Sequence, residues 1–247
     1  MFDVDKIIEN GKAYRLSPGS SDKLASSIPE GDREFYTTLM KEGIKQKKHD
    51  KDEVVLILAV TPWEYFGSND NGDALFEKPF FKIGKEGTLP VTNKSFLTRA
   101  MASRNHQYKT PDKAIGDILY AMYNTKYKRV EVLIRYDWAK ATKECLKIKR
   151  NNCLLESMGY RIFASDLPPE SGEFCSYCGH HNRIPEDRCS HLKTMVGSLI
   201  DGVPVFMMNG IGYFVDISSI VIPGDFNART IMRATGEEKD AKKNIDK

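Results

Sequence analysis

The sequence predicts an α+β fold, in which several strands form the middle of the chain and a few helices lie around them. Three observations lead to this prediction. Residues 54–60 form an unbroken aliphatic run, which is typical of a strand buried on both faces. Residues 129–136 alternate between apolar and charged side chains, as a strand with one buried face does. Residues 31–47 repeat apolar side chains at helical spacing, with Tyr36 and Met40 on one stripe.

The composition is that of an ordinary globular protein, since 40% of the 247 residues are hydrophobic and 29% are charged. The formal charge is only +3, from 37 basic and 34 acidic residues, so we expect no nucleic-acid partner. The longest apolar run is too short to cross a bilayer, and the first residues lack the basic start and apolar core of a secretory signal. Three of the five cysteines cluster, which favours a reducing compartment and a metal site over disulfides.

We divide the chain into three parts. Residues 1–50 form an extended N-terminal arm followed by the helix, and they end in a charge run at 45–51 that we interpret as a solvated linker. Residues 51–234 form the main domain, with an insert rich in cysteine and histidine at about 167–195. Residues 235–247 form a charged C-terminal tail.

The main domain contains further elements. A tight Asx-rich turn at 66–73 is favoured over a calcium loop, because the spacing of its acidic residues does not match an EF-hand. Thr92 is expected to cap a helix over 93–103. The charged residues of the strand at 129–136 are expected to point outward. Strands are expected at 114–123 and 129–136, joined by a hairpin turn. A helix capped by Asp137 is expected to run to about 149, with Ala141, Cys145 and Ile148 on one stripe. Strands at 203–208 and 212–222 and a closing helix over 226–234 are expected to follow.

The stretch at 153–162 is interpreted as a strand with a serine in its middle. Side chains alternate along a strand, so Leu155, Ser157 and Gly159 share one face, opposite to Met158. Because Gly159 has no side chain, another backbone can approach beside Ser157. A small hydroxyl with space next to it is what a serine nucleophile needs, although many serines in strands have no such role.

The insert carries candidate metal ligands in the pattern Cys175-x2-Cys178-x10-Cys189-x-His191. Thiolates and imidazoles bind Zn²⁺ tetrahedrally, and a Cys-x-x-Cys pair places two sulfurs on one turn. A small loop with few apolar residues buries too little apolar surface to be stable by itself, so we expect a structural zinc ion to stabilise its fold. His180 and His181 are alternative fourth ligands.

Two further polar residues are candidates for chemistry. His106 follows the helix expected at 93–103, and an ordinary surface histidine is the alternative. Asp216 lies in an apolar strand, where alternation places it on the face of Phe214. A carboxylate on that face is costly unless it is paired, and a histidine would pair with it; an edge-strand acid that faces solvent is the alternative. Together with Ser157, these residues are the parts of a base-activated nucleophile.

Three segments occur in an order and spacing that resemble a known family. The first runs from the helix at Phe96 through His106 to an Ile-Gly strand at 115–116. The second is the Ser-x-Gly-aromatic strand at 157–160, and the third is an acid-hydrophobic-Ser-hydrophobic strand at 215–223 that ends in proline. Together with the Asx-rich turn and the cysteine-rich insert, they resemble the prohead proteases, the capsid maturation serine proteases of tailed bacteriophages, which are related in fold to herpesvirus assemblins.

The resemblance covers residues 53–234, and it implies a closed or nearly closed β-barrel of the herpesvirus-protease type with peripheral helices. It also implies that Ser157 is the nucleophile, His106 the general base and Asp216 the residue that orients the imidazole. Many relatives have Glu where this chain has Asp216, and most lack the insert. We therefore take the role of the insert from the residues alone, as a zinc staple for a long loop.

The function that the resemblance implies is that of a serine endopeptidase. Its substrates would be scaffold and major capsid proteins, and its own chain, inside an assembling procapsid in the host cytoplasm. The arm at 1–50 and the tail after 234 are then expected to be targeting or self-cleavage segments. Homo-oligomer formation is left open.

Two other functions compete with this one. A non-catalytic, zinc-stapled component that binds capsid or scaffold proteins would leave Ser157 and His106 far apart. An enzyme of another class would be a cysteine hydrolase that uses Cys153 or Cys145, or a zinc hydrolase.

Overall fold

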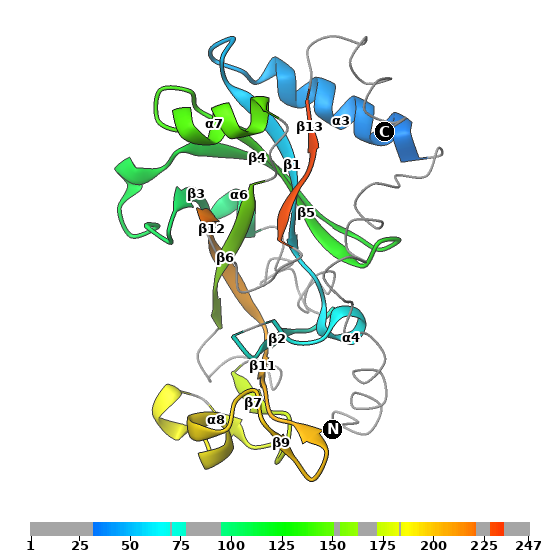
Figure 1. Cartoon of the computed structure of the whole chain (residues 1–247), viewed down its shortest axis with the longest axis vertical. Coiled ribbons are helices and arrows are strands. Elements are labelled where there is room, and N and C mark those ends of the chain that lie inside the picture. Colours follow the sequence, from blue (N-terminus) through cyan, green and yellow to red (C-terminus); the bar gives the residue numbers. More distant parts are fainter. Residues whose placement is uncertain are drawn as a thin grey trace, which may run out of the picture.

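The protein has two lobes joined by a pair of long strands (Figure 1). The structure is a computed structural model, which describes residues 32–69, 71–77, 95–150, 154–162, 172–182, 184–220 and 228–234. The upper lobe is a curled sheet with helices on its outside, and the lower lobe contains the cysteine-rich insert. The expected N-terminal arm, the C-terminal tail, Thr92 and Cys153 lie outside the described residues.

The upper lobe is built on seven strands: β1 (Glu53–Val60), β3 (Met101–Arg104), β4 (Gly116–Asn124), β5 (Arg129–Tyr136), β6 (Leu155–Ile162), β12 (Gly212–Ile220) and β13 (Arg229–Arg233). They pair in the order β1-β13-β6-β12-β3-β4-β5, and β1 also pairs with β5, so the sheet curls until it meets itself. Two seams are thin: β3 and β4 share the pair Ala102–Gly116, and β13 and β6 share Arg229–Leu155. The predicted α+β class, with more strand than helix, is confirmed.

The helices are short and lie around the sheets: α3 (Arg33–Lys45), α4 (Trp63–Phe66), α6 (Ser95–Thr98), α7 (Thr142–Lys149) and α8 (Ser190–Thr194), with 3-10 turns at Pro111–Lys113 and Pro185–Asp187. Helix α7 directs Ala141, Cys145 and Ile148 into the core of the curled sheet, as its sequence stripe predicted. Helix α3 lies across the outside of β1 and β5, where Tyr36 and Met40 pack on the sheet.

The charged residues of β5 are buried, which corrects the expectation that they point outward to solvent. The alternation itself is as predicted, because Val130 and its alternate neighbours face the core. Helix α3 covers the other face, so Arg129, Glu131 and Arg135 are at most 4% exposed. Each is paired: Arg129 with Glu131, and Arg135 with Asp52 at 2.8 Å. Pairing is what makes buried charge tolerable.

Two expected helices are wrong. The segment expected to be helical over 93–103 contains only the single turn α6 and then becomes strand β3, which pairs with β12. The expected closing helix is instead strand β13, which fills the gap between β1 and β6. In both places, sheet pairing with distant strands overrides a weak local helical preference.

The lower lobe has a four-stranded sheet in the order β2-β11-β7-β8, formed by β2 (Asp73–Leu75), β7 (Glu173–Cys175), β8 (His181–Asn182) and β11 (Met207–Asn209). A small hairpin of β9 (Leu199–Ile200) and β10 (Val203–Pro204) lies beside it. The Asx-rich turn before β2 is confirmed, because Asn69 Oδ1 accepts hydrogen bonds from the backbone N–H of Asn71 and Asp73. Strand β11 leads directly into β12, which carries the lower lobe into the upper one.

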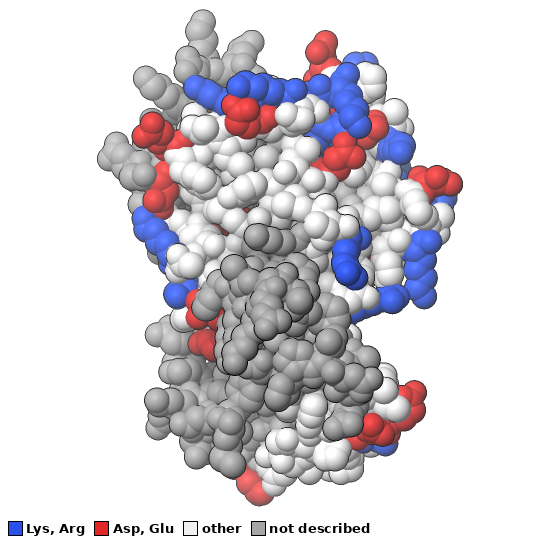
Figure 2. Space-filling model, turned by 180° about the vertical axis from the view of Figure 1, so that it is seen from behind, with Lys and Arg blue, Asp and Glu red and all other residues white. Residues whose placement is uncertain are grey.

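Figure 2 shows the face behind Figure 1, where Lys and Arg alternate with Asp and Glu around the upper lobe. No single-sign patch dominates the described part of this face, in keeping with a net charge of +3. None of the helices in the described residues is both long and apolar enough to span a bilayer.

Candidate active site and metal centre

A β-bulge in β12 decides which way Asp216 points. Phe214 pairs with Tyr160 on β6, but Asp216 pairs with the very next residue, Gly159, so Val215 is an extra residue. Because opposed residues share a face, the bulge places Phe214 and Asp216 on opposite faces of the sheet. Regular alternation predicted that they share one face, and that expectation is wrong.

The bulge is held by a polar contact on the core side. The backbone N–H of Phe214 donates to Ser95 Oγ at 2.7 Å, and the Phe214 ring stacks on Phe96 with centroids 4.1 Å apart. Both rings are fully buried in the main core. Helix α6 therefore fixes Phe214 inward, and the bulge leaves Asp216 directed to the outer face.

The outer face of β6 and β12 collects the predicted site residues. Ser157 lies directly opposite Ser218, and Gly159 lies directly opposite Asp216. The prediction that Ser157 and Gly159 share a face with space beside the serine is therefore confirmed. The side chain that uses this space is a carboxylate: a Cβ at position 159 would lie 2.2 Å from Asp216 Oδ1. Ser157 is half-buried, whereas Asp216 has no exposed surface.

His106 reaches the same face from a tight turn after β3. Asn105 and His106 have φ of 46° and 56°, the left-handed region that non-glycine residues seldom adopt. The turn is fixed at both ends. Arg104 forms a two-pronged ion pair with Glu144 on α7, at 2.6 Å from each nitrogen. The backbone N–H of His106 donates to Ser218 Oγ at 3.1 Å.

His106 and Asp216 form a close pair. The Nδ1 atom of His106 lies 3.1 Å from Asp216 Oδ2 and 3.3 Å from Oδ1. The hydrogen bond to this carboxylate raises the pKa of His106 above its usual value of 6.5, against the opposing effect of partial burial. The carboxylate accepts from Nδ1–H, which leaves Nε2 as the ring nitrogen able to accept a proton. The imidazole is 41% exposed, so Nε2 is accessible.

The three predicted residues are therefore neighbours on one face, on three adjacent strands or their ends. Within the described residues, no hydrogen bond joins the His106 ring to the Ser157 hydroxyl. Looser contacts between a nucleophile and its base are common in the absence of substrate. Ser218 lies between them in the sheet, because it is the cross-strand partner of Ser157 and accepts a hydrogen bond from the His106 backbone.

Sequence reasoning missed two polar residues of this site. Ser103 Oγ lies 3.1 Å from Asp216 Oδ2 and 2.7 Å from Ser218 Oγ, and Ser218 Oγ donates to Asp216 Oδ2 at 2.5 Å. Both serines are fully buried. Ser218 could have been found from the sequence, because its place two residues after Asp216 puts it on the same strand face. Ser103 gave no such signal, because β3 was expected to be helical.

A third missed residue lies behind the site. Glu156 precedes Ser157 and points into the core, where Tyr136 donates a hydrogen bond to Oε1 at 2.9 Å. Its Oε2 has no hydrogen-bond partner among the described residues. Burial raises the pKa of Glu156 to about 8, so the carboxyl is largely protonated at neutral pH.

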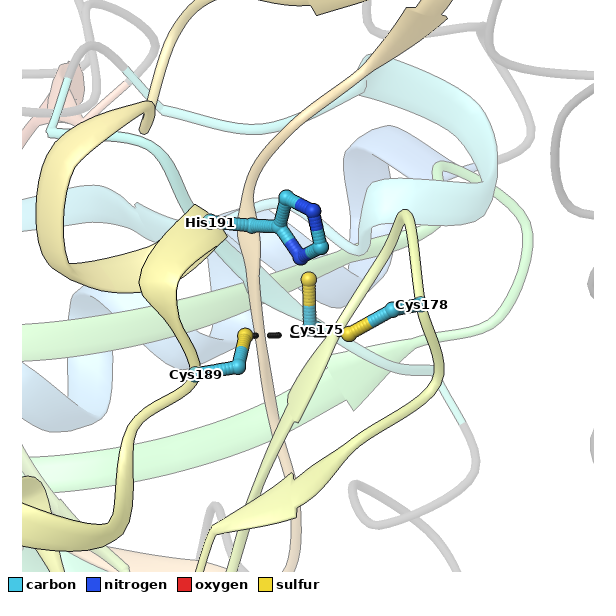
Figure 3. Close-up of side chains that lie close together, drawn as sticks. All are labelled: Cys175, Cys178, Cys189 and His191. Carbon is cyan, nitrogen blue, oxygen red and sulfur yellow. Dashed lines mark hydrogen bonds between the residues drawn. The ribbon is translucent and has the colours of Figure 1, made fainter.

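The predicted metal ligands come together in the lower lobe. The ligand atoms of Cys175, Cys178, Cys189 and His191 all lie within 4.8 Å of one another. Figure 3 shows the imidazole directed at the three sulfurs, with Cys175 at the end of β7 and His191 on α8. The Cys178 and Cys189 sulfurs are 3.7 Å apart. This Cys₃His cluster can bind a metal ion.

The donor set fits a metal better than it fits free thiols. His191 Nδ1 is buried and has no hydrogen-bond partner among the described residues, as expected of a nitrogen that binds a metal ion. The alternative ligands lie elsewhere in the described part of the chain. His180 Nε2 is 3.2 Å from the carbonyl oxygen of Asp187, and His181 stacks on Phe174. Among the three candidates, His191 completes the cluster.

The competing cysteine nucleophile is disfavoured. Cys145 has no exposed surface, and burial raises the pKa of its thiol to about 12, so it carries little thiolate at neutral pH. Cys153 lies outside the described residues.

Comparison of the chain with protein-family models, with curated proteins and with solved structures found no match.

Proposed function

We propose that the protein is a serine endopeptidase, with Ser157 as nucleophile, His106 as general base and Asp216 as the acid that orients the imidazole. The observation that carries the proposal is the pair between His106 Nδ1 and the buried Asp216 carboxylate, on the same sheet face as Ser157. A surface histidine with no role would not need a fully buried carboxylate behind its ring. Nor would it need a strained backbone.

The chemistry follows from these positions. Ser157 Oγ attacks the peptide carbonyl carbon while its proton passes to His106 Nε2. The imidazolium then gives that proton to the leaving amine as the C–N bond breaks. Water next attacks the acyl-enzyme and gives its proton to His106 Nε2, and the imidazolium returns a proton to Ser157 Oγ as the ester bond breaks. Asp216 stabilises the imidazolium that forms between these steps. It also holds the tautomer that leaves Nε2 free to accept.

The substrate class comes from the resemblance to the prohead proteases. On that basis, the enzyme cleaves scaffold and major capsid proteins, and its own chain, within an assembling procapsid in the host cytoplasm. The barrel is then of the herpesvirus-protease type. The curled seven-stranded sheet with the site on its outer face is compatible with this architecture.

The metal centre is proposed to hold a structural Zn²⁺ ion. Three sulfurs and one nitrogen make a complete tetrahedral ligand set, which leaves no open position for water, as structural sites do. The ion would hold together the segment from β7 to α8, which lies between β6 and β12 in the chain. A zinc hydrolase is less favoured, because catalytic zinc sites keep a position open.

The test uses a fluorophosphonate probe, which reacts with activated serines and needs no known substrate. We expect the full chain to be labelled once, with the modified peptide containing Ser157. Ser157→Ala is expected to abolish labelling, and His106→Ala to reduce it by about 10²- to 10⁴-fold, the usual contribution of a general base.

Ser219→Ala is the matched control, because it removes a neighbouring hydroxyl from the opposite face of the sheet. Labelling at Ser157 that persists in His106→Ala at the rate of the unmodified chain would overturn the proposal, as would a folded chain that is not labelled.

A non-catalytic binding component is the second candidate. Its prediction that Ser157 and His106 lie far apart is not met, because their strands both pair with β12, but exposed apolar side chains in the insert and just after it favour it. Ile184, Met195 and Val196 are each at least 40% exposed, and Leu199 is 71% exposed. A contiguous group of such side chains would be typical of a contact surface. A folded, zinc-loaded chain without labelling at Ser157 would favour this candidate.

A further inference from the structure

We infer that Ser218 is the positioning residue of the site: it fixes the backbone of the base and the carboxylate of the acid with one hydroxyl group. The inference rests on the proposed function for its consequence in catalysis, but its geometry stands independently. Ser218 Oγ contacts three partners that come from two strands and one turn, namely Asp216, Ser103 and His106.

The hydroxyl group of Ser218 joins the acid to the turn that carries the base. Ser218 has one hydroxyl hydrogen, which it donates to Asp216 Oδ2 at 2.5 Å. A lone pair of the same oxygen accepts the backbone N–H of His106 at 3.1 Å. Ser103 Oγ lies 2.7 Å away and donates its own hydrogen to Asp216 Oδ2. Ser218 therefore uses its hydrogen on the acid and a lone pair on the backbone of the base.

The carboxylate receives a matching set of donors. Asp216 Oδ2 accepts from Ser218 and lies 3.1 Å from both Ser103 Oγ and His106 Nδ1. Because Asp216 has no exposed surface, these side chains stand in for water. Loss of one of them leaves the carboxylate free to turn away from the imidazole.

The same hydroxyl holds a strained backbone. Asn105 and His106 are both left-handed, a backbone conformation that non-glycine residues keep only where the surroundings hold them there. The N–H of His106 has its acceptor in Ser218, and the N–H of Asn105 donates to the Ser219 carbonyl oxygen at 3.4 Å. Strand β12 thus carries both the acid and the support for the turn that presents the base.

Ser218 lies opposite the proposed nucleophile, which links this arrangement to the reaction. Ser157 is its direct cross-strand partner, and such partners have Cβ atoms about 5 Å apart. Ser218 therefore lies beside the proposed nucleophile and also binds the backbone of the proposed base. A misplacement of about 1 Å in such a site is enough to cost on the order of 100-fold in rate.

The experiment compares Ser218→Ala with Ser103→Ala and with Ser219→Ala. The first readout is exchange of the His106 backbone amide followed by NMR, which does not depend on activity. In the unmodified chain this amide lies in an exposed turn, yet we expect at least tenfold protection from its bond to Ser218. Ser218→Ala is expected to remove that protection, whereas Ser103→Ala and Ser219→Ala leave it within twofold.

The second readout is the imidazole tautomer from ¹⁵N shifts of His106. We expect the Nδ1–H tautomer in the unmodified chain and a mixture in Ser218→Ala. The third is fluorophosphonate labelling of Ser157, expected to fall about 10- to 100-fold in Ser218→Ala. Ser218→Thr, which retains the hydroxyl, is expected to recover the amide protection.

Each outcome bears on the inference separately from the proposed function. An His106 amide that exchanges at the unprotected rate in the unmodified chain would overturn the inference, even if Ser218→Ala failed to fold. Unchanged protection and tautomer in a folded Ser218→Ala chain would do the same. A chain that is never labelled at Ser157, but shows the expected amide and tautomer changes, would contradict the enzyme and support the positioning role.

Discussion

The carboxylate of Asp216 occupies the space that a side chain at position 159 would need. A Cβ built on Gly159 would lie 2.2 Å from Asp216 Oδ1 and 2.8 Å from Val215 Cγ2. The missing side chain on β6 and the bulge on β12 are therefore complementary. The bulge turns the acid outward, and the absence of a side chain at Gly159 makes room for it.

Gly159→Ala is expected to displace Asp216 from the His106 ring. The new methyl group and the buried carboxylate cannot occupy the same space, and both lie on paired backbones that resist movement. The pKa of His106 should then fall toward 6.5, because the hydrogen bond to Asp216 is its main cause of elevation. NMR titration of the imidazole measures this, and a titration identical to that of the unmodified chain would contradict the geometry described.

Asp216→Asn is expected to slow the reaction and to move its pH dependence. The amide retains the size of the carboxylate but cannot hold the imidazole in the same tautomer, so labelling of Ser157 should fall by about 10³- to 10⁴-fold. A general base acts in its neutral form, so in the unmodified chain the rate should rise with pH through a pKa above 6.5. In Asp216→Asn the residual rate should rise at lower pH.

The same pair makes a small contribution to stability with the opposite pH trend. Because the pKa of His106 is raised in the folded state, the stabilisation is fully present below about 6.5 and is lost as the pH rises through the folded value. Urea unfolding of Asp216→Asn and the unmodified chain on both sides of this window provides the check. A difference in unfolding free energy that grew with pH would be inconsistent with the assigned sign.

His191→Ala is expected to lose the metal ion, whereas His180→Ala is expected to retain it. Each histidine lies two residues after a cysteine of the cluster, His180 after Cys178 and His191 after Cys189, but only the His191 ring lies among the three sulfurs. Metal content by mass spectrometry should be one ion per chain in the unmodified protein and in His180→Ala. Chelation should lower the melting temperature of the unmodified protein and of His180→Ala, and leave that of His191→Ala unchanged. Equal metal content in the two variants would count against the assigned ligand set.

Glu156→Gln is expected to stabilise the protein increasingly as the pH rises. The folded-state pKa of Glu156 is about 8, against 4.5 for the free group, so folding takes up a proton and stability falls across this window. Glutamine keeps an oxygen for the Tyr136 hydrogen bond and has no charge to bury. The gain over the unmodified chain should reach a few kcal/mol near pH 8 and vanish as the pH falls below 4.5.

Glu144→Gln provides the contrast for that measurement. Despite its burial, the ion pair with Arg104 lowers the pKa of Glu144, so its contribution is present at neutral pH and lost in acid. This variant should therefore be less stable than the unmodified chain at pH 8. If both variants shifted stability in the same direction, burial would not be the cause of the Glu156 behaviour.

Some parts of both sites could be predicted from the sequence, where they depend on local spacing. Alternation along β6 placed Ser157 and Gly159 on one face, and the Cys-x-x-Cys pattern placed the sulfurs together. Choosing His191 over its two neighbours required the fold, since all three histidines are close in sequence. The roles of Ser157, His106 and Asp216 in catalysis remain predictions.

The errors have a common physical origin in contacts between distant residues. Strands β3 and β13 are short and have weak patterns of their own, and each forms because a neighbouring strand offers unpaired backbone groups. The bulge at Val215 depends on Ser95, which is remote in sequence and takes the amide of Phe214. No periodicity within β12 predicts that contact.

The bulge has a consequence for how this strand tolerates changes of length. Removal of Val215 would leave Phe214 opposite Tyr160 and Asp216 opposite Gly159, which is ordinary antiparallel register. A one-residue gap at this point in an alignment would therefore be silent, with the acid still on the outer face. The same gap between Asp216 and Ser218 would place the two residues on opposite faces of the sheet. The site would then be lost, although every residue named in it would still be present. A relative of this protein should accordingly be recognised by counting from Asp216 to Ser218, and not from Phe214 to Asp216.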